Sequence, residues 1–182
     1  MLKESITIQL KDGRTAMLRN PEISDAQAML DCLKQTAEET HFILRTPREC
    51  ESMTVESEER FIQSMREYDG VLMYVCEVDG KMAGNGQIAF NNRDRTWHRA
   101  SIAIGLLKEY WGLGIGTAIM QALIDEARAR KIRQVELEFM EGNSRGRALY
   151  EKLGFRITGM RPDCYMLEDG TLLNEYHMTL KL

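Results

Sequence analysis

The sequence predicts an α/β fold with a mixed, mostly antiparallel sheet, and three observations lead to this prediction. Apolar residues from Val71 to Phe90 follow the two-residue period of strands, with Asp79-Gly80 between them as a tight turn. From Gly114 to Arg130 the apolar residues change to helical spacing. Strand-helix-strand units do not repeat along the chain, which argues against a purely parallel sheet.

Local signals place each element in order. Asp12-Gly13 and Asp169-Gly170 accept the positive φ of tight hairpins, Ser24 and Thr54 suit helix starts, and Gly154 suits a helix end. The expected elements are strands at Ile6 to Leu10 and Arg14 to Arg19, helices from Ser24 to Glu39 and after Thr54, strands at Val71 to Val78, Met82 to Phe90 and Ala100 to Leu107, a helix from Gly114 to Arg130, a strand at Val135 to Met140, a helix from Asn143 to Leu153, and strands at Phe155 to Met160, Tyr165 to Leu167 and Leu172 to Leu180.

Length and composition narrow the class of protein. The 182 residues, 43% hydrophobic and 29% charged, contain no linker-like stretch, so residues 1–182 are expected to form a single domain. A net charge of −4 argues against general affinity for nucleic acid. The first ten residues lack the apolar run of a signal peptide or membrane span, and a cytoplasmic protein is expected. The four cysteines and three histidines are scattered, so no metal site is predicted.

The most informative segment is the glycine-rich turn from Lys108 to Thr117, between a buried strand and an amphipathic helix. Its glycines allow a ligand to approach the backbone closely, and the helix start presents N–H groups that favour a phosphate or pyrophosphate. A P-loop is excluded because no Gly-Lys-Ser/Thr follows. A dinucleotide-binding turn is disfavoured, because position 117 is threonine where that motif needs a third glycine or alanine.

A second segment, Asn143 to Phe155, adds a short helix with an unusual stripe. Asn143, Gly146 and Tyr150 stand at i, i+3 and i+7 and share one face. An amide, a bare backbone and a phenol suit the wall of a narrow polar ligand site better than a core.

Together the two segments resemble the GNAT superfamily of N-acetyltransferases, with motifs Q/R-x-x-G-x-G/A and N-x-x-A-x-x-L-Y-x-x-x-G-F. The first motif matches Trp111 to Gly116, with Trp111 in place of Gln or Arg. The second matches Asn143 to Phe155, with Gly146 in place of Ala. The resemblance implies a V-shaped splay between two central strands, about four flanking helices, and acetyl-CoA as the cosubstrate, with no metal.

The resemblance also implies the positions that bind acetyl-CoA. Backbone N–H groups from the glycine-rich turn would hold the pyrophosphate, and backbone of the preceding strand would pair with the pantetheine arm. Asn143 would hydrogen-bond the pantetheine or a water, and Gly146 would leave it space. The expected cofactor-binding residues are Ile104, Leu106, Gly112, Leu113, Gly114, Ile115, Gly116, Thr117, Asn143 and Gly146.

For the reaction, a neutral amine attacks the thioester in a ternary complex. By resemblance Tyr150 lies near the CoA sulfur and protonates the leaving thiolate, and a backbone N–H near Leu106 meets the oxyanion. The family's strand glutamate is replaced by Ala100. The general base is therefore left open among Glu136, Glu138, His98 and water.

The leading hypothesis for the acceptor is a primary amine of a small molecule of the polyamine, amino acid or aminoglycoside type. Acetylation of the N-terminus or a lysine of a protein is the close alternative. A non-catalytic acyl-CoA-binding regulatory module is the alternative of another class. A homodimer is a further possibility, for which the sequence identifies no interface.

Overall fold

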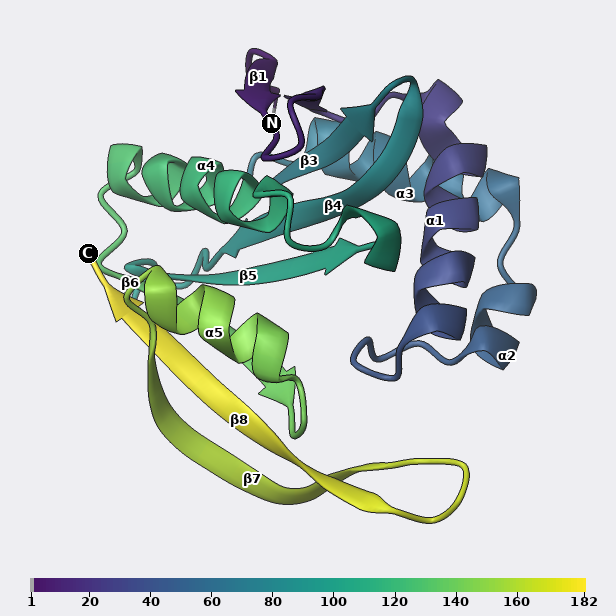
Figure 1. Cartoon of the computed structure of the whole chain (residues 1–182). Coiled ribbons are helices and arrows are strands. Elements are labelled where there is room, and N and C mark those ends of the chain that lie inside the picture. Colours follow the sequence, from purple (N-terminus) through teal and green to yellow (C-terminus); the bar gives the residue numbers. More distant parts are fainter. Residues whose placement is uncertain (1) are drawn as a thin grey trace.

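The computed structural model describes residues 2–182 and contains one eight-stranded sheet in the order β1-β2-β3-β4-β5-β6-β8-β7. Figure 1 shows the arrangement of its strands and helices. The elements are β1 (Ile6–Gln9), β2 (Thr15–Arg19), α1 (Ala26–Glu39), α2 (Pro47–Glu51), α3 (Val55–Glu67), β3 (Val71–Val78), β4 (Lys81–Phe90), β5 (Arg99–Leu106), α4 (Ile115–Ala129), β6 (Gln134–Met140), α5 (Ser144–Lys152), β7 (Arg156–Met166) and β8 (Leu172–Lys181).

The central feature of the sheet is the separation of β5 from β6. These strands are parallel and pair only from Arg99↔Gln134 to Ser101↔Glu136, whereas every other neighbouring pair is antiparallel. Beyond that point β5 continues to Leu106 and β6 to Met140 without pairing with each other. The mixed, mostly antiparallel sheet and its V-shaped splay are confirmed, and the splay leaves one edge of β5 free for a ligand.

Helices cover the two faces of the sheet, and the alternation of strand residues shows which face each helix covers. Leu72 and Tyr74 of β3 belong to the larger core together with Leu123 of α4, whereas Met73 and Val75 pack with residues of α1 and α3. Because successive strand residues point to opposite faces, α4 lies opposite α1 and α3.

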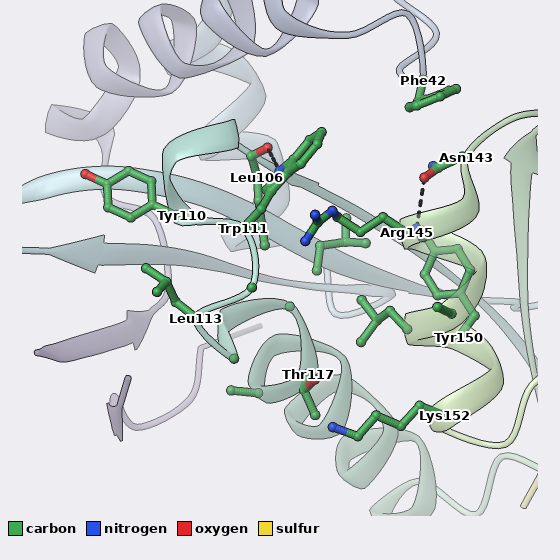
Figure 2. Close-up of a pocket in the computed structure, with 18 of the residues that line it drawn as sticks. Phe42, Leu106, Tyr110, Trp111, Leu113, Thr117, Asn143, Arg145, Tyr150 and Lys152 are labelled. Atoms are coloured by element: carbon green, nitrogen blue, oxygen red, sulfur yellow. Dashed lines mark hydrogen bonds between the residues drawn. The ribbon is translucent and has the colours of Figure 1, made fainter. Parts of the chain in front are cut away.

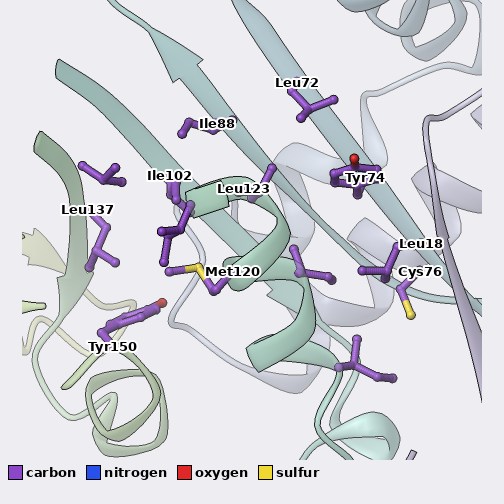
Figure 3. Packing of buried hydrophobic residues seen from close by; sticks show 14 of the residues in the cluster. Leu18, Leu72, Tyr74, Cys76, Ile88, Ile102, Met120, Leu123, Leu137 and Tyr150 are labelled. Atoms are coloured by element: carbon purple, nitrogen blue, oxygen red, sulfur yellow. The ribbon is translucent and has the colours of Figure 1, made fainter. Parts of the chain in front are cut away.

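The α4 face contains the larger core, seen from close by in Figure 3. Ile115, Ile119, Met120 and Leu123 of α4 are wholly buried. At about 1.5–3 kcal/mol for each large apolar side chain removed from water, this helix is firmly attached to the sheet. At Gly86 of β4 an added Cβ would lie 2.4 Å from Ile119, so helix and strand are in close contact. Their packing fixes the start of α4, which forms one wall of the site.

The predicted elements are confirmed with three differences. Residues 2–182 form five α-helices rather than about four, because Thr46 and Glu49 form a capping box that begins the short α2. Ser24 is not an N-cap: Glu22 and Asp25 cap a 3-10 turn there, and α1 begins at Ala26. The strand expected to end at Met160 continues through a bulge to Met166, because β8 pairs with it as far as Leu172.

Candidate active site

A cleft of about 910 Å³ opens at the splay, on the α4 and α5 side of β5. Its walls come from the end of β5, the glycine-rich turn before α4, and α5, as Figure 2 shows. Phe42 and Ile43, from the segment between α1 and α2, line it as well. The volume is within the ~300–1,000 Å³ typical of small-molecule sites.

The glycine-rich turn presents a continuous row of free backbone donors. Gly112 and Gly114 have φ of 82° and 101°, a conformation that glycine adopts without strain. Gly114 is the N-cap of α4 and makes no side-chain cap, and the first turn contains no acidic residue. Within residues 2–182, the N–H groups from Gly112 to Thr117 have no hydrogen-bond acceptor. Six free donors at the positive end of a helix dipole are an arrangement that favours an anion.

The free edge of β5 forms the floor of the cleft. The N–H of Leu107 donates to Ala83, the residue that precedes Gly84 in β4. Since successive strand residues direct their backbone groups to opposite neighbours, Ile104 and Leu106 direct theirs into the splay. The carbonyl of Leu106 accepts a 2.8 Å hydrogen bond from the indole N–H of Trp111. The backbone N–H of Leu106 therefore faces the splay, at the place expected from the resemblance for an oxyanion donor.

Tyr150 reaches the cleft from α5. It is 8% exposed and its ring contacts those of Phe139 and Phe155, at centroid distances of 6.1 and 6.3 Å. Its hydroxyl has no hydrogen-bond partner within residues 2–182. Burial raises the pKa of Tyr150 to about 12, so the phenol remains protonated at neutral pH. A protonated hydroxyl at the cleft wall is available as a proton donor.

Asn143 has a structural role at the start of α5. Its Oδ1 accepts a 2.9 Å hydrogen bond from the N–H of Gly146, which makes it the helix N-cap. A Cβ at Gly146 would lie 2.8 Å from the same amide group, so glycine there accommodates the cap. The Nδ2 group of Asn143 has no partner in the described chain, so it is free to donate in the expected contact with pantetheine.

The expected site residues thus converge, with one exception. The cleft is lined by Ile104, Leu106, Gly112, Leu113, Gly114, Gly116, Thr117, Asn143, Gly146 and Tyr150. Ile115 does not line it, because its side chain is wholly buried in the core and only its backbone N–H belongs to the turn.

Three cations in the cleft lining were not predicted: Lys11 from the N-terminal hairpin, and Arg145 and Lys152 from α5. No carboxylate of the described residues lines the cleft, although the chain carries a net charge of −4. The sequence contains one indication of a cation such as Arg145: position 111, where the family motif has Gln or Arg, is a tryptophan. The position of Lys11 depends on a hydrogen bond from its N–H to the carbonyl of Leu113, far away in sequence.

The candidate bases differ in their surroundings. Glu136 is held by two 2.6 Å hydrogen bonds from Arg99, which lower its pKa. The side chain of Glu138 is 61% exposed, and its Oε1 lies 3.4 Å from Nδ1 of His177 on β8. His98 precedes β5 at the closed end of the splay. At 3.3 Å per residue it is roughly 26 Å along the strand from Leu106.

Within residues 2–182, no helix is long and apolar enough to cross a membrane, and no group of three or more His, Cys, Asp or Glu side chains is arranged to hold a metal ion.

Comparison with known proteins identifies the family. A model of the acetyltransferase (GNAT) family matches residues 34–155. An N-alpha-acetyltransferase from Sulfurisphaera tokodaii is 34% identical over 107 residues, 53% of this chain and 62% of that relative. A ribosomal protein bS18-alanine N-acetyltransferase from Escherichia coli is 37% identical over 62 residues, 34% of this chain and 42% of that enzyme. The chain therefore matches less than two thirds of either relative.

Solved structures agree over more of the chain. A GNAT acetyltransferase from Streptococcus pneumoniae has a TM-score of 0.84 and 27% identity, covering 92% of this chain and 99% of that one. A phosphinothricin acetyltransferase from Sinorhizobium meliloti, solved with acetyl-CoA, shares the fold with a TM-score of 0.78 at 20% identity, covering 92% and 88% of the two chains. From the matched motifs, the splayed sheet and these relatives, the chain belongs to the GNAT family of acetyltransferases.

Proposed function

We propose that this protein transfers the acetyl group of acetyl-CoA to a primary amine. The observation that supports this most directly is the row of six unpaired N–H groups from Gly112 to Thr117 at the end of a splayed strand. A pyrophosphate carries the charge that such a row binds, and a cleft lined by cations and by no described carboxylate suits the rest of a polyanionic cosubstrate.

The free edge of β5 supports the same assignment. The pantetheine arm contains two amide groups, which can hydrogen-bond to backbone at Ile104 and Leu106 in the manner of an added strand. Trp111 already donates to the carbonyl of Leu106, so this pairing depends on the N–H and carbonyl of Ile104, and the Leu106 N–H is left for the reacting group. The thioester would then lie in the splay, within reach of the Tyr150 hydroxyl.

The reaction forms a C–N bond and breaks the C–S bond, and two protons must be moved. The leaving thiolate takes a proton from Tyr150, whose pKa of about 12 keeps it protonated until that step. The Leu106 N–H faces the splay and stabilises the oxyanion that forms on the former carbonyl oxygen. Tyr150 regains its proton from solvent after the thiol leaves.

Glu138 is the best-placed acceptor for the amine proton among the three candidate side chains. It follows Glu136 on β6, two residues past the last pairing with β5, so it lies where the splay opens. It alternates with Leu137 and Phe139, which face α5, and therefore points to the opposite face of the sheet. Glu136 is fully engaged by Arg99. His98 is too far from Leu106 to act.

The acceptor class is proposed in two forms. A small primary amine of the polyamine, amino acid or aminoglycoside type is the first. The N-terminal α-amine of a peptide is the second, and the specific observation in its favour is that two relatives bear the names N-alpha-acetyltransferase and ribosomal protein bS18-alanine N-acetyltransferase. A third relative, named an L-methionine sulfoximine/L-methionine sulfone acetyltransferase, keeps the small-molecule class open.

The cosubstrate is tested with a pair of matched glycine variants. Gly114 in the turn and Gly170 in the β7–β8 hairpin have φ of 101° and 84°, and an added Cβ meets nothing within 4 Å at either. Alanine at either position therefore imposes a similar backbone strain of about 1–2 kcal/mol. We expect Gly114→Ala to weaken acetyl-CoA binding at least tenfold in calorimetry and Gly170→Ala to leave it unchanged. Equal affinities in both variants would place the pyrophosphate elsewhere.

The activity is tested by thiol release from acetyl-CoA with a panel of amines. The panel contains a polyamine, amino acids, an aminoglycoside, and one peptide in three forms: free, blocked at its N-terminus, and blocked at its lysine. Thiol release with the free peptide, but not with the peptide blocked at its N-terminus, would identify the α-amine as the acceptor. Binding of acetyl-CoA with no turnover on any amine would favour the regulatory module instead.

A further inference from the structure

Arg145 occupies an unusual position for a surface arginine of α5. Its guanidinium lies over the ring of Trp111 at 5.2 Å from the centroid. Its Nη1 is 3.8 Å from the place where a Cβ on Gly112 would be. Figure 2 shows the side chain extending from α5 across the cleft to the glycine-rich turn. The charge is thus placed beside the first of the free backbone donors.

The charge of Arg145 is not neutralised by the rest of the described chain. Within residues 2–182 the guanidinium forms no ion pair and no hydrogen bond, and no carboxylate lines the cleft around it. Arg147, two residues further along α5, pairs with Glu151 at 2.8 Å. An arginine that stays unpaired in a concave site, beside six unpaired N–H groups, is arranged for an anion.

Trp111 explains how the side chain is held there. Its indole N–H donates to the carbonyl of Leu106, which fixes the orientation of the ring, and the face of the ring is turned to the guanidinium. Stacking on tryptophan reduces the conformational freedom of an arginine without using its N–H donors. Trp111 also occupies the position where the first sequence motif has Gln or Arg. Lys108 of the turn also lies over this ring, with its Nζ 6.0 Å from the centroid, but it does not line the cleft, whereas Arg145 does.

We propose that Arg145, supported by Trp111, binds the pyrophosphate of acetyl-CoA from the α5 side, opposite the backbone donors of the turn. This inference rests on the proposed function. A guanidinium donates two parallel hydrogen bonds to phosphate oxygens, which a lysine cannot reproduce. The pyrophosphate is thereby held between two elements far apart in sequence, the glycine-rich turn and α5.

The test is calorimetric binding of three ligands to the whole protein and to variants. Acetyl-CoA contains the pyrophosphate and the 3′-phosphate, acetyl-3′-dephospho-CoA contains only the pyrophosphate, and S-acetylpantetheine contains neither. The matched control is Arg147→Ala, which removes the same charge from the same helix outside the cleft. Both arginines are exposed, so both variants are expected to fold, and thermal unfolding verifies this.

We expect Arg145→Ala to lower the affinity for acetyl-CoA and for acetyl-3′-dephospho-CoA by the same factor, about 10- to 100-fold, which is the range for the loss of a hydrogen bond to a charged group. S-acetylpantetheine affinity should not change. Arg145→Lys should recover only part of the loss, and Arg147→Ala should change each affinity less than twofold. Trp111→Leu should weaken the binding of the two nucleotide ligands because it removes the support of Arg145. The double variant Trp111→Leu/Arg145→Ala should therefore bind them only slightly less tightly than Arg145→Ala does.

Three outcomes would overturn the inference. A loss for acetyl-CoA that disappears with acetyl-3′-dephospho-CoA would assign Arg145 to the 3′-phosphate. An equal loss for S-acetylpantetheine would show that the variant perturbs the cleft as a whole. If the wild type binds acetyl-CoA and Arg145→Ala binds it equally well, the role of Arg145 is refuted but the proposed function is not. If the wild type does not bind acetyl-CoA, the proposed function is refuted as well.

Discussion

The sharpest kinetic prediction concerns Tyr150→Phe. The hydroxyl of Tyr150 forms no hydrogen bond within the described chain, and the ring is packed against Phe139 and Phe155. Removing the oxygen therefore leaves no partner unsatisfied, and the free energy of unfolding should change by less than about 1 kcal/mol. A proton donor of this kind typically contributes about 10²–10⁴-fold to the rate, so kcat should fall at least about 100-fold, or ~2.7 kcal/mol of barrier.

The binding and pH behaviour of the same variant separate catalysis from packing. Calorimetry should give an unchanged affinity for acetyl-CoA, because the ring that lines the cleft remains. In the wild type a pKa of about 12 means that Tyr150 is still protonated at pH 10, so it should cause no loss of kcat below that pH. An ordinary tyrosine, with a pKa of 10.0, would be half ionised there.

A buried tyrosine outside the cleft provides the control. Tyr74 is 4% exposed in the core and does not line the cleft, so Tyr74→Phe should retain full kcat. If Tyr150→Phe keeps kcat within about threefold of the wild type, the hydroxyl only packs along the cosubstrate and the proposed proton transfer is wrong.

Three further predictions concern stability. Leu123→Ala, at a wholly buried position of α4, should lower the free energy of unfolding by about 2–5 kcal/mol in denaturant titrations. Asn143→Ala removes the N-cap of α5 and should cost about 1 kcal/mol, whereas Asn143→Asp retains an acceptor and should lose less in the same assay. Burial raises the pKa of Glu58, although Arg45 opposes this, so its contribution to stability declines as the pH rises above the ordinary value of 4.5. Glu58→Gln should therefore gain stability relative to the wild type between pH 4 and 7.5, and an equal difference at both values would contradict this.

The parts of the fold that sequence predicted well are those whose signals are local. Glycines at 112 and 114, followed by apolar residues at helical spacing, determined both the turn and the start of α4. The prediction failed where an element is very short or where its length is determined by a strand far away in sequence. The five residues of α2 are too few for a hydrophobic period, and β7 extends to Met166 because β8 pairs with it through a bulge.

The same distinction applies to the site. Tyr150 and the turn could be predicted because each lies in a continuous motif. The preference for Glu138 over Glu136 could not, since it depends on the bidentate ion pair between Arg99 and Glu136 and on the point at which the β5–β6 pairing ends. Likewise Arg145 follows Gly112 by 33 residues, and only the packing of α5 beside the turn brings the two together.

The distribution of charge suggests why the cleft can bind a polyanion in an acidic protein. Lys11, Arg145 and Lys152 are directed to the α5 side of the splay, whereas Glu138 projects from the opposite face of β6. Under the proposed function, an anionic cosubstrate and a cationic amine are attracted to different faces of the same sheet, which reduces competition between them for one surface. In this proposal the two substrates meet in the gap where β5 and β6 separate, beside the Leu106 N–H and the Tyr150 hydroxyl. Because β5 and β6 diverge immediately after Ser101 and Glu136, the three residue pairs that join these strands lie at the closed end of that gap.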